Sequence, residues 1–144
     1  MKFEDILNEW EKDSQIDKTE IGNESLKIPK LHFKYYKIYV AEKGTLRVLE
    51  SQLKTLRLEK HEFYTQGHTE ETRGKGWQLP AKGMILKADL HMYMEADKDI
   101  IELSLKIGMQ QEKVDALEAI IKSLSNRGYW LRNALEWQKF INGG

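Results

Sequence analysis

The segment between Lys27 and Lys60 combines basic and aromatic side chains in a pattern that suits a polyanion. It holds nine basic residues against three acidic ones, and five aromatic or imidazole rings lie among its first cations. Four lysines recur at steps that place them along one stripe of a helix: Lys27, Lys30, Lys34 and Lys37. Phosphates bind such cations and bases stack on rings, so this segment predicts binding of single-stranded nucleic acid. The alternative is a solvated helix face beside core tyrosines.

A second basic group follows on the same predicted helix. Its cations share one side and are interrupted only by Glu50: Lys43, Arg47, Lys54, Arg57 and His61. The full set of predicted DNA-binding residues is Lys27, Lys30, Lys34, Lys37, Lys43, Arg47, Lys54, Arg57 and Lys60, with Tyr36 as a stacking ring. Trp77 is either a further stacking ring or a packing anchor.

Charge is segregated along a chain whose formal net charge is zero. Residues 1–26 carry eight acids and three bases, a balance of −5, whereas residues 27–60 carry nine bases and three acids, a balance of +6. The absence of cysteine excludes disulfides and thiolate metal sites and fits a reducing compartment. No apolar run approaches a membrane span, and no signal-peptide stretch opens the chain, so we expect an intracellular protein without a membrane segment.

Patterns typical of catalysis are missing from the sequence. The four histidines have no partner at the spacing of a helical metal site. The segment Gly74-Lys75-Gly76 lacks the rest of a phosphate-binding loop, and helix capping accounts for Asp97 and Asp99 without a metal. We therefore predict that the protein is not an enzyme and has no metal site and no cofactor.

Hydrophobic periodicity predicts an all-α fold. We expect short helices over residues 3–11 and 18–26, then one long helix from Pro29 to near Gly67. A glycine-rich loop over residues 67–83 and a short helix or strand over residues 84–94 precede a long C-terminal helix. This order predicts three regions: a basic DNA-binding region (1–66), a flexible loop (67–83) and an oligomerisation region (84–144).

The C-terminal helix carries a coiled-coil-like seam with a second apolar stripe beside it. One helix with two adjacent seams cannot bury both against a single partner, so we predict self-association into a ring or bundle. The residues expected to mediate it are Ile107, Val114, Leu117, Ile121, Leu124, Trp130, Leu131, Leu135 and Trp137.

Several short motifs occur in an order that is similar to a known family. They are Met1-Lys2-Phe3-Glu4-Asp5, Ile16-Asp17, Phe63-Tyr64 followed by Gly67, Ala96-Asp97-Lys98-Asp99, Asn126-Arg127-Gly128-Tyr129 and the ending from Arg132 to Gly143. In this order the chain resembles the UvsY family of recombination mediators from T-even-type bacteriophages and their cyanophage relatives.

The resemblance implies an all-helical protein that forms a ring of six or seven subunits and binds single-stranded DNA. Its implied partners are a RecA-like phage recombinase, which it helps to load, and the phage single-strand-binding protein that coats the DNA. The implied location is the cytoplasm of the infected bacterial host. In the family a Lys-x-Arg pair before the aromatic pair is tied to DNA binding; here Lys60 matches the arginine and Leu58 the lysine, with charge supplied instead by Arg57 and Lys54.

The main alternative is a structural coiled-coil adaptor that does not bind nucleic acid. In that case the basic segment pairs with the acidic N-terminal segment of a neighbour. Both functions can also hold together, with Asp5, Glu9, Asp13 and Asp17 competing with DNA for the same basic strip. A metal-dependent nuclease is a more distant alternative.

Overall fold

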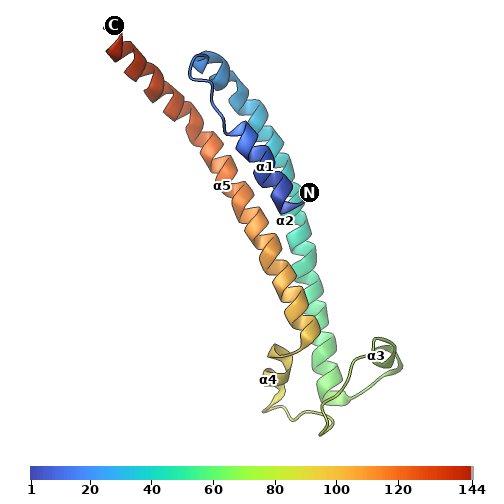
Figure 1. The fold of residues 1–144 in the computed structure, drawn as a ribbon. Helices are drawn as coiled ribbons and strands as arrows, with labels where there is room; N and C mark the ends of the chain where they lie inside the picture. Colours follow the sequence, from blue (N-terminus) through green and yellow to red (C-terminus); the bar gives the residue numbers. More distant parts are fainter. Residues whose placement is uncertain (144) are drawn as a thin grey trace. The chain divides into compact units, whose positions relative to one another are not determined.

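The computed structural model describes residues 1–143, which contain five α-helices and no strand. In chain order they are α1 (Phe3–Asp13), α2 (Ile21–Gln66), α3 (Glu70–Gly74), α4 (Leu90–Glu95) and α5 (Lys98–Ile141) (Figure 1). The predicted all-α class, with a long central and a long C-terminal helix, is confirmed. Within the described residues, no helix is both long and apolar enough to cross a membrane.

The helices form two compact units, each built from segments that are distant in sequence. The first unit joins Met1–Gly44 to the part of α5 from Gln111 onward, and the second unit is Thr45–Gln110. The three regions predicted from the sequence follow chain order, whereas each unit takes one segment of α2 and one of α5. The division arises because α2 and α5 pair within each unit, so that segments distant in sequence belong to the same unit.

Helix α2 begins earlier than the sequence predicts and includes Pro29 in its interior. Proline has no N–H to offer the carbonyl of Ser25, but both residues are exposed, so water can bond that carbonyl. The separate helix expected over residues 18–26 is therefore the first part of α2. At the other end, Gly67 has φ of +90° and donates its N–H to the carbonyl of Phe63 at 3.0 Å, which closes the helix.

In the first unit, α1 packs against both long helices (Figure 1). The core consists of Ile6 from α1, Tyr35 from α2, and Leu117, Ile120 and Leu124 from α5. The two long helices run antiparallel here. Lys113 contacts Glu42 at 3.3 Å, whereas a Cβ on Gly128 would lie 3.8 Å from the side chain of Ile28. That distance is an ordinary van der Waals contact, so the packing there does not by itself require a glycine in a helix that continues to Ile141.

Part of the predicted oligomerisation seam lies inside this unit. Val114, Leu117, Leu124 and Leu131 are buried within the chain itself. Periodicity identifies which face of a helix is covered but not what covers it, and here α1 and α2 contribute to the cover. These four residues are therefore withdrawn from the surface expected to contact another subunit.

The second unit has its own core, in which the chain between α2 and α5 folds back onto the end of α2. Its buried members are Phe63, Tyr64, Ile85 and Leu90, with Trp77, Leu79, Tyr93 and Met94 packed against them. The N–H of Ile85 donates to the carbonyl of Tyr64 at 2.8 Å, which ties the loop to the helix. Helix α4 is shorter than the predicted helix over residues 84–94 and begins at Leu90.

The core of the first unit makes a prediction about stability. Replacing the fully buried Leu124 by alanine should lower the free energy of unfolding by about 2–5 kcal/mol, because it removes apolar contacts and leaves a cavity. Replacing Leu26, which is 79% exposed on α2, should change it by less than about 0.5 kcal/mol. Urea unfolding at one protein concentration measures both, and equal losses would contradict the assigned core.

Candidate nucleic-acid interface

The predicted cations of α2 divide into exposed side chains and side chains already paired by the protein. Five are exposed and form no ion pair within residues 1–143: Lys30 and Lys37 in the first unit, and Arg47, Lys54 and Arg57 in the second. The other four, Lys27, Lys34, Lys43 and Lys60, each contact another side chain. The exposed group has all of its donors available to a phosphate, whereas each of the other four already uses at least one donor within the protein.

On the first unit, Lys30 and Lys37 lie two helical turns apart on the side of α2 that faces solvent. Phe33 is 66% exposed between them, and Tyr36 is also largely exposed. The ring of Tyr36 lies between two neighbours, with its centroid 6.2 Å from that of His32 and 6.4 Å from that of Tyr39. These contacts within the helix restrict the ring. The face therefore offers two cations with an open phenyl ring between them, which suits phosphates and a stacked base.

A shallow groove borders this face of the first unit. It is lined by Asp13, Lys27, Lys30, Leu31, Phe33 and Lys34. Lys27 is partly neutralised there, because its ammonium lies 2.9 Å from the carboxylate of the buried Glu24. The groove combines three lysines with the side of an aromatic ring, and so it provides both kinds of group that single-stranded DNA needs.

Lys34 lies at the edge of the groove between two carboxylates of α1. Its ammonium is 2.7 Å from Glu9 and 2.6 Å from Asp13. Burial alone would lower the pKa of Lys34, but the hydrogen bonds to Asp13 and Glu9 outweigh it and raise that pKa. Asp13 also accepts a hydrogen bond from the Tyr35 hydroxyl at 2.7 Å. Burial opposes ionisation of Asp13, but the bonds from Lys34 and Tyr35 prevail and hold its pKa below the ordinary value.

Lys43 is only partly available to a ligand. It donates a hydrogen bond to the Tyr39 hydroxyl at 3.0 Å, and its ammonium lies 5.3 Å from the centroid of that ring. A contact with a neutral hydroxyl leaves the positive charge uncompensated. Lys43 can therefore contribute to the field of the first unit even though its side chain is held against the helix.

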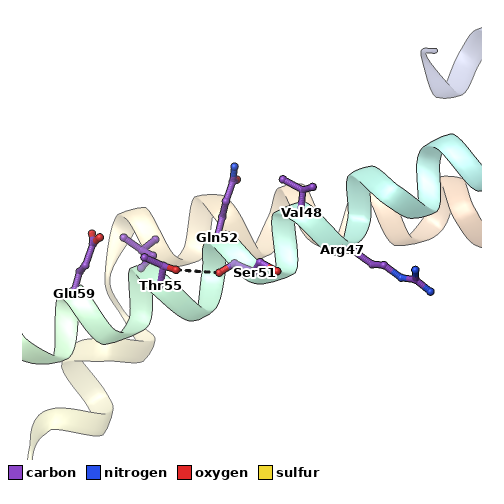
Figure 2. A pocket seen from close by; sticks show the side chains of 7 residues that line it. Arg47, Val48, Ser51, Gln52, Thr55 and Glu59 are labelled. Carbon is purple, nitrogen blue, oxygen red and sulfur yellow. Dashed lines mark hydrogen bonds between the residues drawn. The ribbon is translucent and has the colours of Figure 1, made fainter.

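On the second unit, Arg47 borders a shallow strip on the outer face of α2 (Figure 2). The strip consists of Arg47, Val48, Ser51, Gln52, Thr55, Leu56 and Glu59. The Thr55 hydroxyl donates to the carbonyl of Ser51 at 3.3 Å, so this polar side chain is directed to its own backbone (Figure 2). Lys54 and Arg57 are exposed on the same helix. Unlike the face on the first unit, this strip has no aromatic ring.

The structure places Lys60, another predicted DNA-binding residue, in the interior of the second unit. It is 3% exposed, and its ammonium lies 2.7 Å from Asp99 and 3.1 Å from Asp97. The same ammonium lies 3.8 Å from the centroid of the Trp77 ring, a short cation–π contact. Lys60 is neutralised and covered, so we do not retain it in the interface.

Asp97, one of the two carboxylates that pair with Lys60, has a structural role in the second unit. Asp97 precedes α5 and accepts the backbone N–H groups of Asp99 and Ile100, both at 3.0 Å, which caps the helix. It also accepts the Tyr64 hydroxyl at 2.6 Å. Burial opposes ionisation of Asp97, but the hydrogen bonds from Tyr64, Ile100 and Lys60 prevail and lower its pKa. The same burial and the bond to Asp97 raise the pKa of Tyr64.

Trp77, for which the sequence allowed two roles, lies in this network as a packing residue. Its ring contacts Phe63 edge-on, with centroids 5.4 Å apart, and a second ammonium, that of Lys75, lies 4.9 Å from its centroid. Lys75 is itself bonded to Glu59 at 3.2 Å. The Trp77 ring is thus in contact with Lys60, Lys75 and Phe63 of its own chain. These contacts favour the packing role, because they occupy surfaces of the ring on which a base would stack.

Large apolar side chains, most of them aromatic, are exposed together at the end of α5. Six of them are more than two-fifths exposed: Tyr129, Trp130, Leu135, Trp137, Phe140 and Ile141. The rings of Trp137 and Phe140 stack with centroids 5.6 Å apart and line a shallow depression with Asn133 and Glu136. Three of these residues belong to the predicted oligomerisation set, and two others of that set, Ile107 and Ile121, are partly buried.

Sequence reasoning did not select two residues that the geometry brings forward. Phe33 is an exposed ring three residues from Lys30 and four from Lys37, and this helical spacing was a readable signal. Glu9 was noted only as one of several acids. Its contact with Lys34 joins residues 25 positions apart and has no local signature. No cluster of three or more potential metal ligands occurs among the residues that the structure describes.

Comparison with known proteins gives one family and one fold. The family described as "recombination, repair and ssDNA binding protein UvsY" matches residues 9–144. No curated protein sequence matches the chain significantly.

Crystal structures of the recombination mediator protein UvsY from bacteriophage T4 share the fold. One (lattice type II) has a TM-score of 0.80 at 21% identity and covers 99% of both chains. A second (lattice type IV) has a TM-score of 0.77 at 19% identity over 97% of this chain and 98% of that one. A third (lattice type I) has a TM-score of 0.80 at 18% identity over 94% and 98%.

Because Lys60 is buried and Arg57 is exposed, we predict that their replacement has different effects on stability. Replacing Lys60 by methionine should cost about 3–5 kcal/mol of stability, because it leaves the buried Asp97 without its cation. Replacing the exposed Arg57 by methionine should cost less than about 0.5 kcal/mol. Chemical unfolding of the two variants checks this; a Lys60 variant as stable as the wild type would show that Lys60 is not a buried structural residue and is available to bind DNA.

Proposed function

The chain belongs to the UvsY family of recombination, repair and single-stranded-DNA-binding proteins, and on that premise we propose how it acts. It binds single-stranded DNA on the exposed face of α2 and helps a RecA-like recombinase to load onto DNA coated by a single-strand-binding protein. The family is one of recombination mediators and not of enzymes, so the chemistry of the site is that of binding.

The observation that carries the proposal is the exposed face formed by Lys30, Phe33 and Lys37. Two ammonium groups without carboxylate partners in the described chain stand on either side of a ring that is 66% exposed. In the free chain the exposed ring has no stacking partner and the two ammonium groups form no ion pair within residues 1–143. A polynucleotide uses both, because its phosphates bind the cations and its bases stack on the ring.

A single face of this size binds weakly, so we propose that self-association multiplies it. The uncovered end of α5 would provide the contact, through Trp130, Leu135 and Trp137. An apolar patch of large aromatic side chains is the kind of surface that protein interfaces bury. Once one face holds the strand, binding to the next subunit becomes intramolecular, and the whole assembly binds far more tightly than one chain. A ring of six or seven subunits fits this scheme.

Such an assembly suggests a route to mediation. A strand held along several linked faces has its phosphates engaged and its bases partly stacked on protein rings. The single-strand-binding protein then competes for the same groups and is more easily displaced. The recombinase receives a strand that is already extended and held in place.

The alternative function, a structural adaptor without nucleic-acid binding, has one observation in its favour. Lys34 is paired with Glu9 and Asp13, and Lys27 with Glu24, so acidic residues of the chain itself neutralise part of the basic segment. Lys30 and Lys37 have no carboxylate partner within residues 1–143, so a neighbour's acids could bind them in an adaptor; the exposed ring of Phe33 between them favours DNA instead. The two functions differ in a simple measurement of DNA binding.

The exposed face predicts a specific loss of DNA binding. Replacing both Lys30 and Lys37 by alanine should weaken binding of an oligo(dT) strand about tenfold at low salt. It should also reduce the slope of log affinity against log salt by about 1.4 per subunit, since two phosphate contacts are lost. Fluorescence anisotropy across a salt series measures both quantities.

The matched control is the pair Lys106→Ala and Lys122→Ala, two exposed lysines of α5 that form no ion pair within residues 1–143. It removes the same charge from a different surface and should leave the affinity within about twofold. Equal effects of the two double variants would show that net charge alone, and not this face, binds the strand.

The uncovered end of α5 predicts a change in assembly. Replacing Trp137 and Phe140 by aspartate should convert the assembly to smaller species in sedimentation, because charges would enter the proposed apolar contact. DNA affinity should fall as well, since avidity is lost. The same substitutions at Leu26 and Leu86, exposed leucines elsewhere, should leave the assembly unchanged; if they disrupt it equally, the contact lies elsewhere.

A further inference from the structure

We propose that the groove on the first unit is a self-masked phosphate subsite, in which Glu9 occupies Lys34 until a backbone phosphate of single-stranded DNA replaces it. This inference rests on the proposed function and adds to it a device that regulates the same surface. The groove is the one lined by Asp13, Lys27, Lys30, Leu31, Phe33 and Lys34.

The two carboxylates that hold Lys34 are not equivalent. Asp13 is fixed, because it also accepts the hydroxyl of the fully buried Tyr35 at 2.7 Å, and its backbone carbonyl accepts an N–H from Arg127 at 3.1 Å. Glu9 bonds through its carboxylate only to Lys34 within the described chain, at 2.7 Å. Asp13 therefore positions the ammonium, and Glu9 is the partner that can leave without disturbing the core.

The cost of releasing Glu9 is small. The side chains of Lys34 and Glu9 are 37% and 39% exposed, and an ion pair this open to water contributes only about 0–1 kcal/mol. A phosphate of a polynucleotide brings the same charge and, in addition, releases condensed counterions from the strand. The free energy of exchanging the Glu9 carboxylate for a phosphate on Lys34 is therefore close to zero. The exchange becomes favourable when the strand is also bound by neighbouring residues.

The neighbouring groups decide which anion makes this exchange. Lys30 lines the groove without a carboxylate partner in the described chain, and Phe33 lines it with an open ring. A strand whose base stacks on Phe33 and whose phosphate binds Lys30 is held close to Lys34. A free phosphate ion lacks both the base and the second phosphate. The mask thus discriminates in favour of a polynucleotide over small anions, which gain too little from Lys34 alone to displace Glu9.

The test compares Glu9→Gln with Glu11→Gln in the full chain. Both remove one negative charge from α1, but Glu11 is exposed and its side chain has no ion pair within residues 1–143, so only the first change unmasks Lys34. Glu9→Gln should tighten oligo(dT) binding between about two- and fivefold, which is the most that an exposed ion pair can return. Glu11→Gln should change the affinity by less than about 1.5-fold.

A second step assigns the effect to Lys34. In a chain that carries Lys34→Gln, the further change Glu9→Gln should no longer tighten binding beyond the effect of Glu11→Gln in the same background. Thermal unfolding of each variant checks that the core around Tyr35 is retained. Equal affinities of the Glu9 and Glu11 variants, or a gain that persists without Lys34, would overturn the mask.

Failure of the mask and failure of the proposed function give different results. If the wild type binds oligo(dT) and loses binding on replacement of Lys30 and Lys37, but Glu9→Gln has no effect, only the mask is wrong. If the wild type does not bind oligo(dT) at low salt, both are wrong. Binding of inorganic phosphate by the wild type as tightly as oligo(dT), at equal phosphate concentration, would overturn the discrimination between a strand and a small anion.

Discussion

Burial of Tyr35 between α1 and α5 is the constraint on which the rest of the first unit depends. The side chain is fully buried, its ring meets Trp10 edge-on at 5.5 Å, and its hydroxyl donates to Asp13. A helix with one residue fixed in this way can no longer rotate about its axis. The opposite side of α2 is thereby left to solvent, and it is the side that carries Lys30, Phe33 and Lys37. Lys34, next to Tyr35 in sequence, comes to the boundary between core and solvent, where α1 reaches it. The proposed binding face and its proposed mask are thus two results of one packing arrangement.

Lysines of a single helix serve three purposes in this chain, and their surroundings decide which. Lys60 lies among two carboxylates and an aromatic ring, where removal from water is compensated by close partners, and it holds the start of α5 to the end of α2 in the second unit. Lys30 is exposed and forms no ion pair within residues 1–143, so its charge is available to a ligand. Lys34 is intermediate, with partners that are half open to water. The distinction is one of desolvation: a fully buried pair is expensive to break, whereas an exposed pair can be exchanged.

The middle and the end of α5 illustrate a related contrast. On the middle of the helix the chain itself covers Leu117 and Leu124, which contribute to the stability of the monomer. Its last turns carry Trp130, Trp137 and Phe140, each more than half exposed. A helix that extends beyond its own core with large aromatic rings exposed is poorly suited to life as a monomer. Linking several weak binding faces through this end would also supply the avidity that a mediator needs, while leaving each contact weak enough to be exchanged when the recombinase arrives.

The sequence by itself determined the all-α class, the two long helices, the basic and aromatic character of α2, and the family. These depend on residue type and on spacing along one chain, and a period of three to four residues is readable without neighbours. It could not determine that Lys60 is buried while Arg57 is free, or that α1 and α2 cover Leu117 and Leu124. It also left open whether Trp77 packs or stacks. Each of these depends on groups that are distant in sequence: Asp99 lies 39 positions from Lys60, and Glu9 lies 25 positions from Lys34. Only tertiary packing brings such groups within bonding distance, and it alone decides whether a charge meets a carboxylate, a ring or water.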